Sequence, residues 1–237
     1  MGAGDRVVGR SRYCDYPPEA QRLPVVGGYV DPSLEAILAL LPDLIVGARG
    51  PAGPGLVRPF EERGIATFFP PTESFAQIQT MILELGRRLG LEEAGRRLVE
   101  TIEAHERKVA AAVADVEKPR VLLLFGTAPI VVAGPKSFAD EMIRRAGGQN
   151  VMTEGTTYPS LGVERMLALD PDVVLHAAMM EKDAAELERM PGFRDLRAVR
   201  RGDLRVLQND VVLRPGPRIG EGLVILARAI HPHRAIP

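Results

Sequence analysis

A motif repeated in the two halves of the chain most constrains its fold. Residues 33–48 read SLEAILALLPDLIVGA, and residues 162–177 read GVERMLALDPDVVLHA. Both copies contain E-x-x-L-A-L-x-P-D followed by an apolar run, and they lie 129 residues apart. Proline ends a helix because it lacks the N–H that the backbone ladder needs and restricts the residue before it. Each copy therefore predicts a short helix, a Pro-Asp turn and a buried strand, and the chain predicts two similar lobes.

Short apolar runs along the chain support an α/β fold. Each is bounded by turn residues, and helix-like stretches lie between the runs; they span residues 44–47, 66–69, 121–125, 173–175 and 204–207. Buried strands that alternate with helices are typical of βαβ units and a parallel sheet. We therefore predict an α/β fold with central, mostly parallel sheets.

A proline-free segment, 74–117, separates the two copies of the motif. The spacing of its apolar residues predicts a helix over 74–89 and, after Gly90, a second helix over 92–116. At 1.5 Å per residue, the second helix would be roughly 37 Å long. We expect an N-terminal lobe over 1–90, a spine helix over 91–117 that joins the lobes, and a C-terminal lobe over 118–237. The alternative is an ordinary crossover helix within one sheet.

Composition and charge exclude several classes of protein. Hydrophobic residues make up 46% of the chain, which supports a packed core and argues against disorder. The formal net charge of −1 gives no electrostatic reason to expect nucleic acid or an anionic membrane as a partner. The single cysteine, Cys14, excludes an internal disulfide.

The sequence carries no recognisable catalytic or metal-binding motif. It lacks H-E-x-x-H, C-x-x-C and G-x-S-x-G, and the AGPKS segment at 133–137 lacks the spacing of a phosphate-binding loop. We expect His231 and His233 to lie in a frayed C-terminal tail rather than at a metal. Nothing here requires an enzyme, although an α/β enzyme with its site at the strand ends, or a sensor module, stays open as an alternative.

The N-terminal segment resembles vitamin B12-binding periplasmic proteins. Residues 5–20 (DRVVGRSRYCDYPPEA), G-G-Y at 27–29 and S-L-E-A-I at 33–37 are similar to the first lobe of that family. The resemblance continues through both copies of the motif, the G-G-Q-N turn at 147–150 and R-P-G-P-R at 214–218. These proteins are the substrate-binding components of ABC importers. They belong to the helical-backbone (class III) metal-chelate-binding group, which also binds haem and ferric siderophores.

The resemblance implies roles for individual residues. By residue match, Glu35 and Glu164 would dock against arginines of the two halves of an ABC permease dimer, a pairing that carboxylates suit well. Ligand contacts in the cleft between the lobes would come from three tyrosines, one acid and one arginine that follows the first-lobe strand: Tyr13, Tyr29, Tyr158, Asp210 and Arg49.

The implied ligand is cobalamin or a related corrinoid. The alternative is haem or a ferric siderophore, with one of the three tyrosines as an iron ligand. The family implies a binding protein rather than an enzyme, with no metal site of its own and no covalently bound cofactor. It also implies a location in the periplasm or on the extracellular face of the cytoplasmic membrane, with membrane contact only through the transporter or a lipid anchor.

The sequence departs from the family pattern at its start and in its aromatic residues. The family places a strand and a helix before the V-V-G segment, whereas six residues precede Val7 here and no export signal is present. We expect a first lobe that lacks its N-terminal strand and helix, with an exposed sheet edge that favours poor solubility or an edge-paired dimer. The chain has no tryptophan, which weakens the expectation of cobalamin relative to haem.

Overall fold

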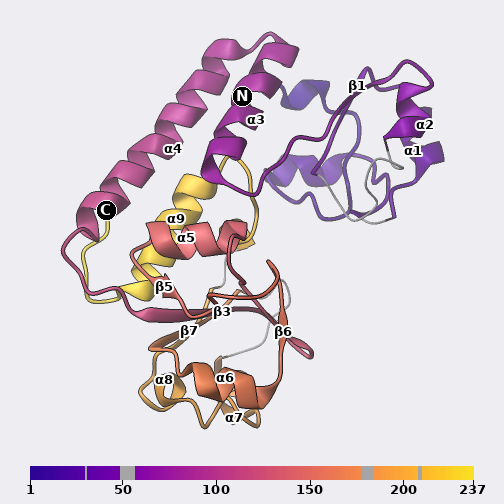
Figure 1. Ribbon diagram of the computed structural model, residues 1–237. Coiled ribbons are helices and arrows are strands. Elements are labelled where there is room, and N and C mark those ends of the chain that lie inside the picture. Colours follow the sequence, from indigo (N-terminus) through magenta and orange to yellow (C-terminus); the bar gives the residue numbers. More distant parts are fainter. Residues whose placement is uncertain (30, 49–56, 178–183, 208–209) are drawn as a thin grey trace. The chain divides into compact units, whose positions relative to one another are not determined.

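The computed structural model describes residues 1–29, 31–48, 57–177, 184–207 and 210–237, and it divides into two compact units (Figure 1). Unit 1 comprises Met1–Thr72 and Leu83–Arg96, and unit 2 comprises Glu73–Ile82 and Arg97–Pro237. The division falls within two helices, α3 (Phe75–Leu89) and α4 (Glu92–Ala112). The lobe boundaries that the sequence suggested, at 90/91 and 117/118, remain predictions.

Unit 1 contains short elements joined by long loops. Among the described residues of this unit, the helices and 3₁₀ turns outside α3 and α4 are η1 (Gly4–Arg6), η2 (Pro18–Arg22), α1 (Leu34–Ala39) and α2 (Arg58–Glu61). Strands β1 (Leu44–Val46) and β2 (Ala66–Phe68) pair in parallel, with Leu44 opposite Ala66. Both strands lie where the apolar runs predicted them.

The two copies of the repeated motif share their backbone conformation. The first copy forms α1 and β1, and the second forms α6 (Val163–Leu169) and β7 (Val173–His176). In each copy the residue directly before the proline adopts a left-handed conformation, with φ of 50° at Leu41 and 41° at Asp170. The left-handed residue thus has the same place in both copies, although α1 ends one repeat position earlier than α6, and in each copy the helix ends before the Pro-Asp turn, as predicted.

Unit 2 is built around a mixed sheet. Its strand order is β6-β4-β3-β7-β8, and β5 pairs with the start of β3. The strands besides β7 are β3 (Arg120–Thr127), β4 (Ile130–Val132), β5 (Gln149–Asn150), β6 (Ser160–Leu161) and β8 (Leu204–Val206). The neighbours β3, β7 and β8 run in parallel, as predicted, whereas β4 is antiparallel to both β3 and β6.

Helices cover both faces of this sheet. Figure 1 shows α5 (Phe138–Arg145) and α9 (Ile219–Ile230) over one face, and α6, α7 (Ala184–Arg189) and α8 (Arg197–Arg200) over the other. Side chains of β3 alternate accordingly. Val121 and Leu123 join the core beneath α5 and α9, whereas Leu122 and Leu124 join the core beneath α6 and α8. The predicted α/β class is confirmed.

Helices α3 and α4 are where the apolar spacing predicted two helices. Gly90 separates them in a left-handed conformation, with φ of 69°. Ile78 and Ile82 of α3 and Ile102 and Val109 of α4 are buried in the same core as α5 and α9. At 21 residues, α4 is about 31 Å long, shorter than the predicted helix over 92–116.

The C-terminal tail differs from the sequence expectation. It is packed rather than frayed, because Ile236 is buried and Arg234 Nε donates to the carbonyl of Ala112 at 3.0 Å. Arg228 Nε also donates to the carbonyl of Ile236 at 3.0 Å. Ile236 and these two arginines anchor the segment that was expected to be a frayed C-terminal tail. Within the described ranges, no helix combines the length and apolar character needed to cross a bilayer.

Candidate functional site

Tyr13 lies on a loop that is wrapped around one guanidinium group. Nη1 of Arg10 donates to the carbonyls of Ser11 at 3.1 Å and Cys14 at 3.2 Å, while Nη2 donates to the carbonyl of Gln21 at 3.1 Å. The side chain of Tyr13 points outward and is 49% exposed. Because the backbone is tied to Arg10, the ring is presented from a fixed loop.

Tyr29 lies on a second loop, which two glycines shape. Gly27 has φ of 107° and bridges Pro32, and an added Cβ would lie within 2.7 Å of backbone atoms of residues 31–33. At Gly28, an added Cβ would collide with the Arg12 and Asp31 side chains. Tyr29 follows directly and is 46% exposed. The G-G-Y sequence thus folds a tight turn that leaves the ring at the surface.

An ion pair joins the two tyrosine loops of unit 1. Arg12 donates from Nη1 to Oδ1 of Asp31 at 2.9 Å and from Nη2 to Oδ2 at 2.8 Å. The hydrogen bonds from Arg12 hold the pKa of Asp31 below its usual value, and Asp31 in turn raises the pKa of Arg12. The guanidinium carbon of Arg12 also lies 5.8 Å from the centre of the Tyr13 ring. Sequence reasoning found both tyrosines but missed this pair.

Tyr158 is the corresponding exposed aromatic of unit 2. Its ring contacts Phe125 edge-on, with centroids 5.5 Å apart, and the residue is 47% exposed. The Tyr158 loop rests on the chain just after β4, where Gly134 N donates to the carbonyl of Thr157 at 2.8 Å. Gly134 has no room for a Cβ because the carbonyl of Thr156 occupies that space. The glycine therefore lets the Tyr158 loop approach the sheet.

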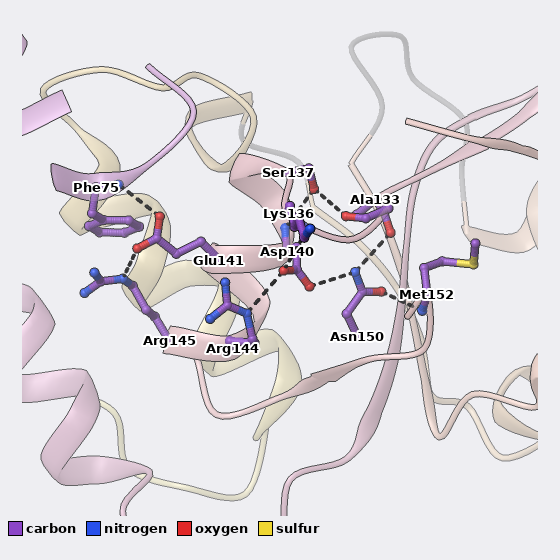
Figure 2. A network of polar contacts seen from close by, with 11 residues as sticks. Phe75, Ala133, Lys136, Ser137, Asp140, Glu141, Arg144, Arg145, Asn150 and Met152 are labelled. Atoms are coloured by element: carbon purple, nitrogen blue, oxygen red, sulfur yellow. Dashed lines mark hydrogen bonds and ion pairs between the residues drawn. The ribbon is translucent and has the colours of Figure 1, made fainter. Parts of the chain in front are cut away.

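A buried polar network supports the segment that carries Gly134 (Figure 2). Ser137 caps α5 by accepting from Asp140 N at 3.0 Å, and its hydroxyl donates to the carbonyl of Gly134 at 2.8 Å. Asn150 donates to Asp140 Oδ1 at 3.0 Å and to the carbonyl of Ala133 at 3.1 Å. The AGPKS segment is thus a helix cap tied to the G-G-Q-N turn.

Glu35 and Glu164 occupy equivalent places in the two repeats. Each is the second residue of its helix, α1 or α6, and each is exposed. Ser33 caps α1 by accepting from Ala36 N at 3.2 Å, and Gly162 takes the equivalent position before α6. A carboxylate in the first turn is favoured by the helix dipole, so both helices tolerate an exposed glutamate there.

The remaining candidate residues are only partly described. Asp210 begins η4 (Asp210–Val212), but its side chain lies outside the described part of the chain. Arg49 lies outside the described residues altogether. Within unit 1 the Arg12–Asp31 pair thus joins the loops that carry Tyr13 and Tyr29, and Tyr158 lies in unit 2. Among the described residues, no three His, Cys, Asp or Glu side chains gather where they could hold a metal ion.

The fold and these surface residues define a class of protein. The exposed tyrosines on anchored loops offer aromatic contact area to a ligand. The chain belongs to the periplasmic binding protein family, whose family model matches residues 1–211. It is thus a substrate-binding protein of the ABC-transporter type, a family of transport components that bind solutes.

Two curated relatives support this placement. The vitamin B12-binding protein of Salmonella typhimurium is 31% identical over 178 residues, covering 75% of this chain and 67% of the relative. An ABC transporter substrate-binding lipoprotein of Bacillus subtilis, YvrC, is described as uncharacterized and is 25% identical over 98% of this chain and 75% of the relative.

A solved structure with a different named ligand is also similar. The periplasmic haem-binding protein RhuT from Roseiflexus sp. RS-1, in apo form, is 29% identical with a TM-score of 0.87. The match covers 98% of this chain and 92% of that chain. The relatives thus name both vitamin B12 and haem as ligands, so family membership alone leaves the ligand open.

Proposed function

We propose that this protein binds cobalamin or a related corrinoid and delivers it to the permease of an ABC importer. The observation that carries the proposal is the set of exposed tyrosines on anchored loops, Tyr13 and Tyr29 on unit 1 and Tyr158 on unit 2. A corrin ring is broad and flat, and aromatic side chains provide large contact area with little loss of conformational freedom. The 31% identity to a vitamin B12-binding protein supports the same ligand class.

Asp210 and Arg49 complete the proposed ligand contacts as polar residues at the fringe of the ring. The protein contributes binding rather than catalysis in this proposal, so none of these residues has a catalytic role. It holds no covalently bound cofactor, and it works in the periplasm or on the outer face of the cytoplasmic membrane. Glu35 and Glu164 are the proposed docking points for the two halves of the permease, where exposed carboxylates would pair with arginines.

Haem or a ferric siderophore is the second candidate ligand. The similarity to a haem-binding protein over 98% of this chain favours it. A tyrosine phenolate is an established type of haem iron ligand, and Tyr13, Tyr29 and Tyr158 are exposed enough to reach one. An enzyme or a sensor module on the same fold is the remaining alternative. An enzyme would convert its ligand, and a sensor module would bind its ligand without stimulating a permease.

The proposal is tested by titrating the protein with cyanocobalamin and, separately, with haemin. Calorimetry would give the affinities, and the visible spectrum would report iron ligation. We expect micromolar or tighter binding of cyanocobalamin and a loss of about fivefold to tenfold in affinity for each of Y13A, Y29A and Y158A. Y16A is the matched control, because Tyr16 is also an exposed tyrosine of unit 1 but is not a proposed contact. Absence of cyanocobalamin binding would contradict the proposal.

A further inference from the structure

Asp31 occupies the two terminal N–H donors of Arg12 that an anionic ligand could otherwise use. Both terminal nitrogens of Arg12 point at the two oxygens of Asp31, at 2.9 and 2.8 Å. This is the forked geometry by which arginine binds carboxylates, including those of ligands. Because Asp31 already fills the fork, Arg12 can offer the same contact to a ligand carboxylate only if the pair opens.

The pair is built into the local fold. Gly28 lies beneath it, since any side chain there would collide with both Arg12 and Asp31. The backbone brings the two loops together independently, because Arg12 N donates to the carbonyl of Gly27 at 2.9 Å. The hydrogen bonds from Arg12 lower the pKa of Asp31, and a carboxylate is ionised at neutral pH in any case, so both members of the pair are charged there.

The other arginine beside Tyr13 is also engaged. The terminal nitrogens of Arg10 donate hydrogen bonds to backbone carbonyls of the Tyr13 loop. In sequence, the two tyrosine segments 10–16 and 27–31 contain Arg10, Arg12, Asp15 and Asp31 as their charged residues, so they carry no net charge. The positive and negative charges of these two segments therefore balance, and the guanidinium groups of Arg10 and Arg12 both have hydrogen-bond partners already.

We propose that the Arg12–Asp31 pair is a specificity-determining element that favours a ring with an uncharged amide fringe over a ring with free carboxylates. This inference rests on the proposed function and narrows its ligand class. A carboxylate brought against the tyrosine loops loses water and finds the forks of Arg10 and Arg12 already occupied, which costs binding energy. The desolvation cost is much smaller for an amide fringe, because amides are neutral and can hydrogen-bond to backbone groups.

The test is to free Arg12 and measure affinity for a carboxylate-bearing ring. In D31A and D31N the fork of Arg12 becomes available, and we expect haemin affinity to rise about fivefold or more while cyanocobalamin affinity changes less than about twofold. Haemin dimethyl ester, which has no free carboxylate, should show no gain. The gain should also shrink at high salt, because exposed charge pairs are screened.

Two further variants separate the freed fork from general effects of charge and folding. D15A removes one negative charge from the same segment but keeps the Arg12–Asp31 pair, so haemin affinity should rise less than about twofold. R12Q breaks the pair without freeing an arginine and should not strengthen haemin binding. It also serves as the folding comparison, judged by circular dichroism.

Three results would overturn the specificity role of the Arg12–Asp31 pair. They are equal gains in affinity for haemin and its dimethyl ester, no gain in D31A and D31N, or an equal gain in R12Q. Wild-type binding of cyanocobalamin with any of these results leaves the proposed function standing while the specificity role fails. If the wild-type protein binds neither cyanocobalamin nor haemin, both the proposed function and the specificity role are overturned.

Discussion

Leu41 and Asp170 take the same left-handed backbone conformation at the end of the two repeated helices, with φ of 50° and 41°. Aspartate tolerates this conformation because its short side chain can bond locally, whereas leucine does so at a cost of roughly 1–2 kcal/mol. Leu41 is also 87% exposed, so packing does not compensate for that cost. The first repeat thus carries a strained residue where the second carries a suitable one.

Relieving that strain should stabilise the protein. We expect L41N to raise the free energy of unfolding by about 0.5–1 kcal/mol, because asparagine adopts the left-handed region more readily. L41A is the control, since it removes the exposed side chain but keeps a Cβ that resists this conformation. Urea unfolding followed by circular dichroism measures both variants. An equal gain in L41A would show that exposure, not backbone strain, is the cause.

At the scale of single residues, sequence reasoning found positions but not pairings. Tyr13, Tyr29 and Tyr158 were identified from motifs, and the structure leaves all three exposed on anchored loops. The Arg12–Asp31 pair escaped notice because its members are 19 residues apart and meet only once Gly27 and Gly28 have folded the turn. A local pattern does not encode a contact that depends on how two loops cross.

At the scale of elements, α3 is capped by a residue from α5. Oε2 of Glu141 accepts from the backbone N–H of Phe75 at 3.1 Å, and Oε1 accepts from Arg145 Nε at 2.8 Å (Figure 2). The guanidinium of Arg145 lies 4.4 Å from the centre of the Phe75 ring. One carboxylate therefore holds the first turn of α3 against α5, close to where the chain passes from unit 1 to unit 2.

Loss of this cap should weaken the attachment of α3. We expect E141A to lower the free energy of unfolding by about 1–2 kcal/mol, because it removes a charged acceptor from a helix N-terminus. E62A is the matched control, since Glu62 pairs with Arg58 at i,i+4 spacing on an exposed surface and should cost about 0.5 kcal/mol or less. Chemical denaturation compares the two variants. A similar loss in both would reduce Glu141 to an ordinary surface ion pair.

The packed C-terminal tail should make stability depend on pH through His231. Its ring lies against Gly147, and burial lowers the pKa of the imidazole below its usual value. The unfolded chain therefore binds a proton more readily than the folded protein. Stability should fall as pH drops from about 6.5 through the folded pKa.

Replacing His231 isolates this effect. H231Q should flatten the decline in thermal unfolding temperature between about pH 6.5 and 5, whereas H233Q should leave the decline as in the wild-type protein. Thermal melts across that pH range provide the measurement. A decline of unchanged slope in H231Q would assign the acid sensitivity to other groups.

Helices with apolar periodicity and strands within apolar runs bounded by turn residues were predictable from the sequence. The five apolar runs correspond to β1, β2, β3, β7 and β8. Strands β4, β5 and β6 were missed because they depend on pairing with β3 or β4 rather than on a pattern of their own. The tail at 231–237 was mispredicted because anchoring by Arg228, Arg234 and Ile236 is tertiary.

At the scale of the whole molecule, the repeated motif predicts a transporter partner with two docking points. Glu35 and Glu164 sit at equivalent places in the two units, both exposed. We expect the double variant E35A/E164A to abolish stimulation of the permease ATPase in liposomes while leaving ligand affinity unchanged, because rim charges orient an encounter without touching the ligand.

A matched double variant checks the specificity of that result. Glu62 and Glu154 are likewise exposed glutamates, one on each unit, and E62A/E154A should retain full stimulation. The prediction fails when both double variants stimulate the permease equally, or when both lose stimulation equally. The expectation that the first lobe pairs through a free sheet edge is separate, and the oligomeric state in solution would test it.

The ligand that the protein takes when both are present tests the proposed function most directly. Equilibrium dialysis with equal concentrations of cyanocobalamin and haemin on both sides of the membrane would measure this in one experiment. We predict that cyanocobalamin accumulates with the protein at close to one equivalent and that haemin is retained at a level at least about fivefold lower. Retention of haemin in preference to cyanocobalamin, or of neither, would contradict the account.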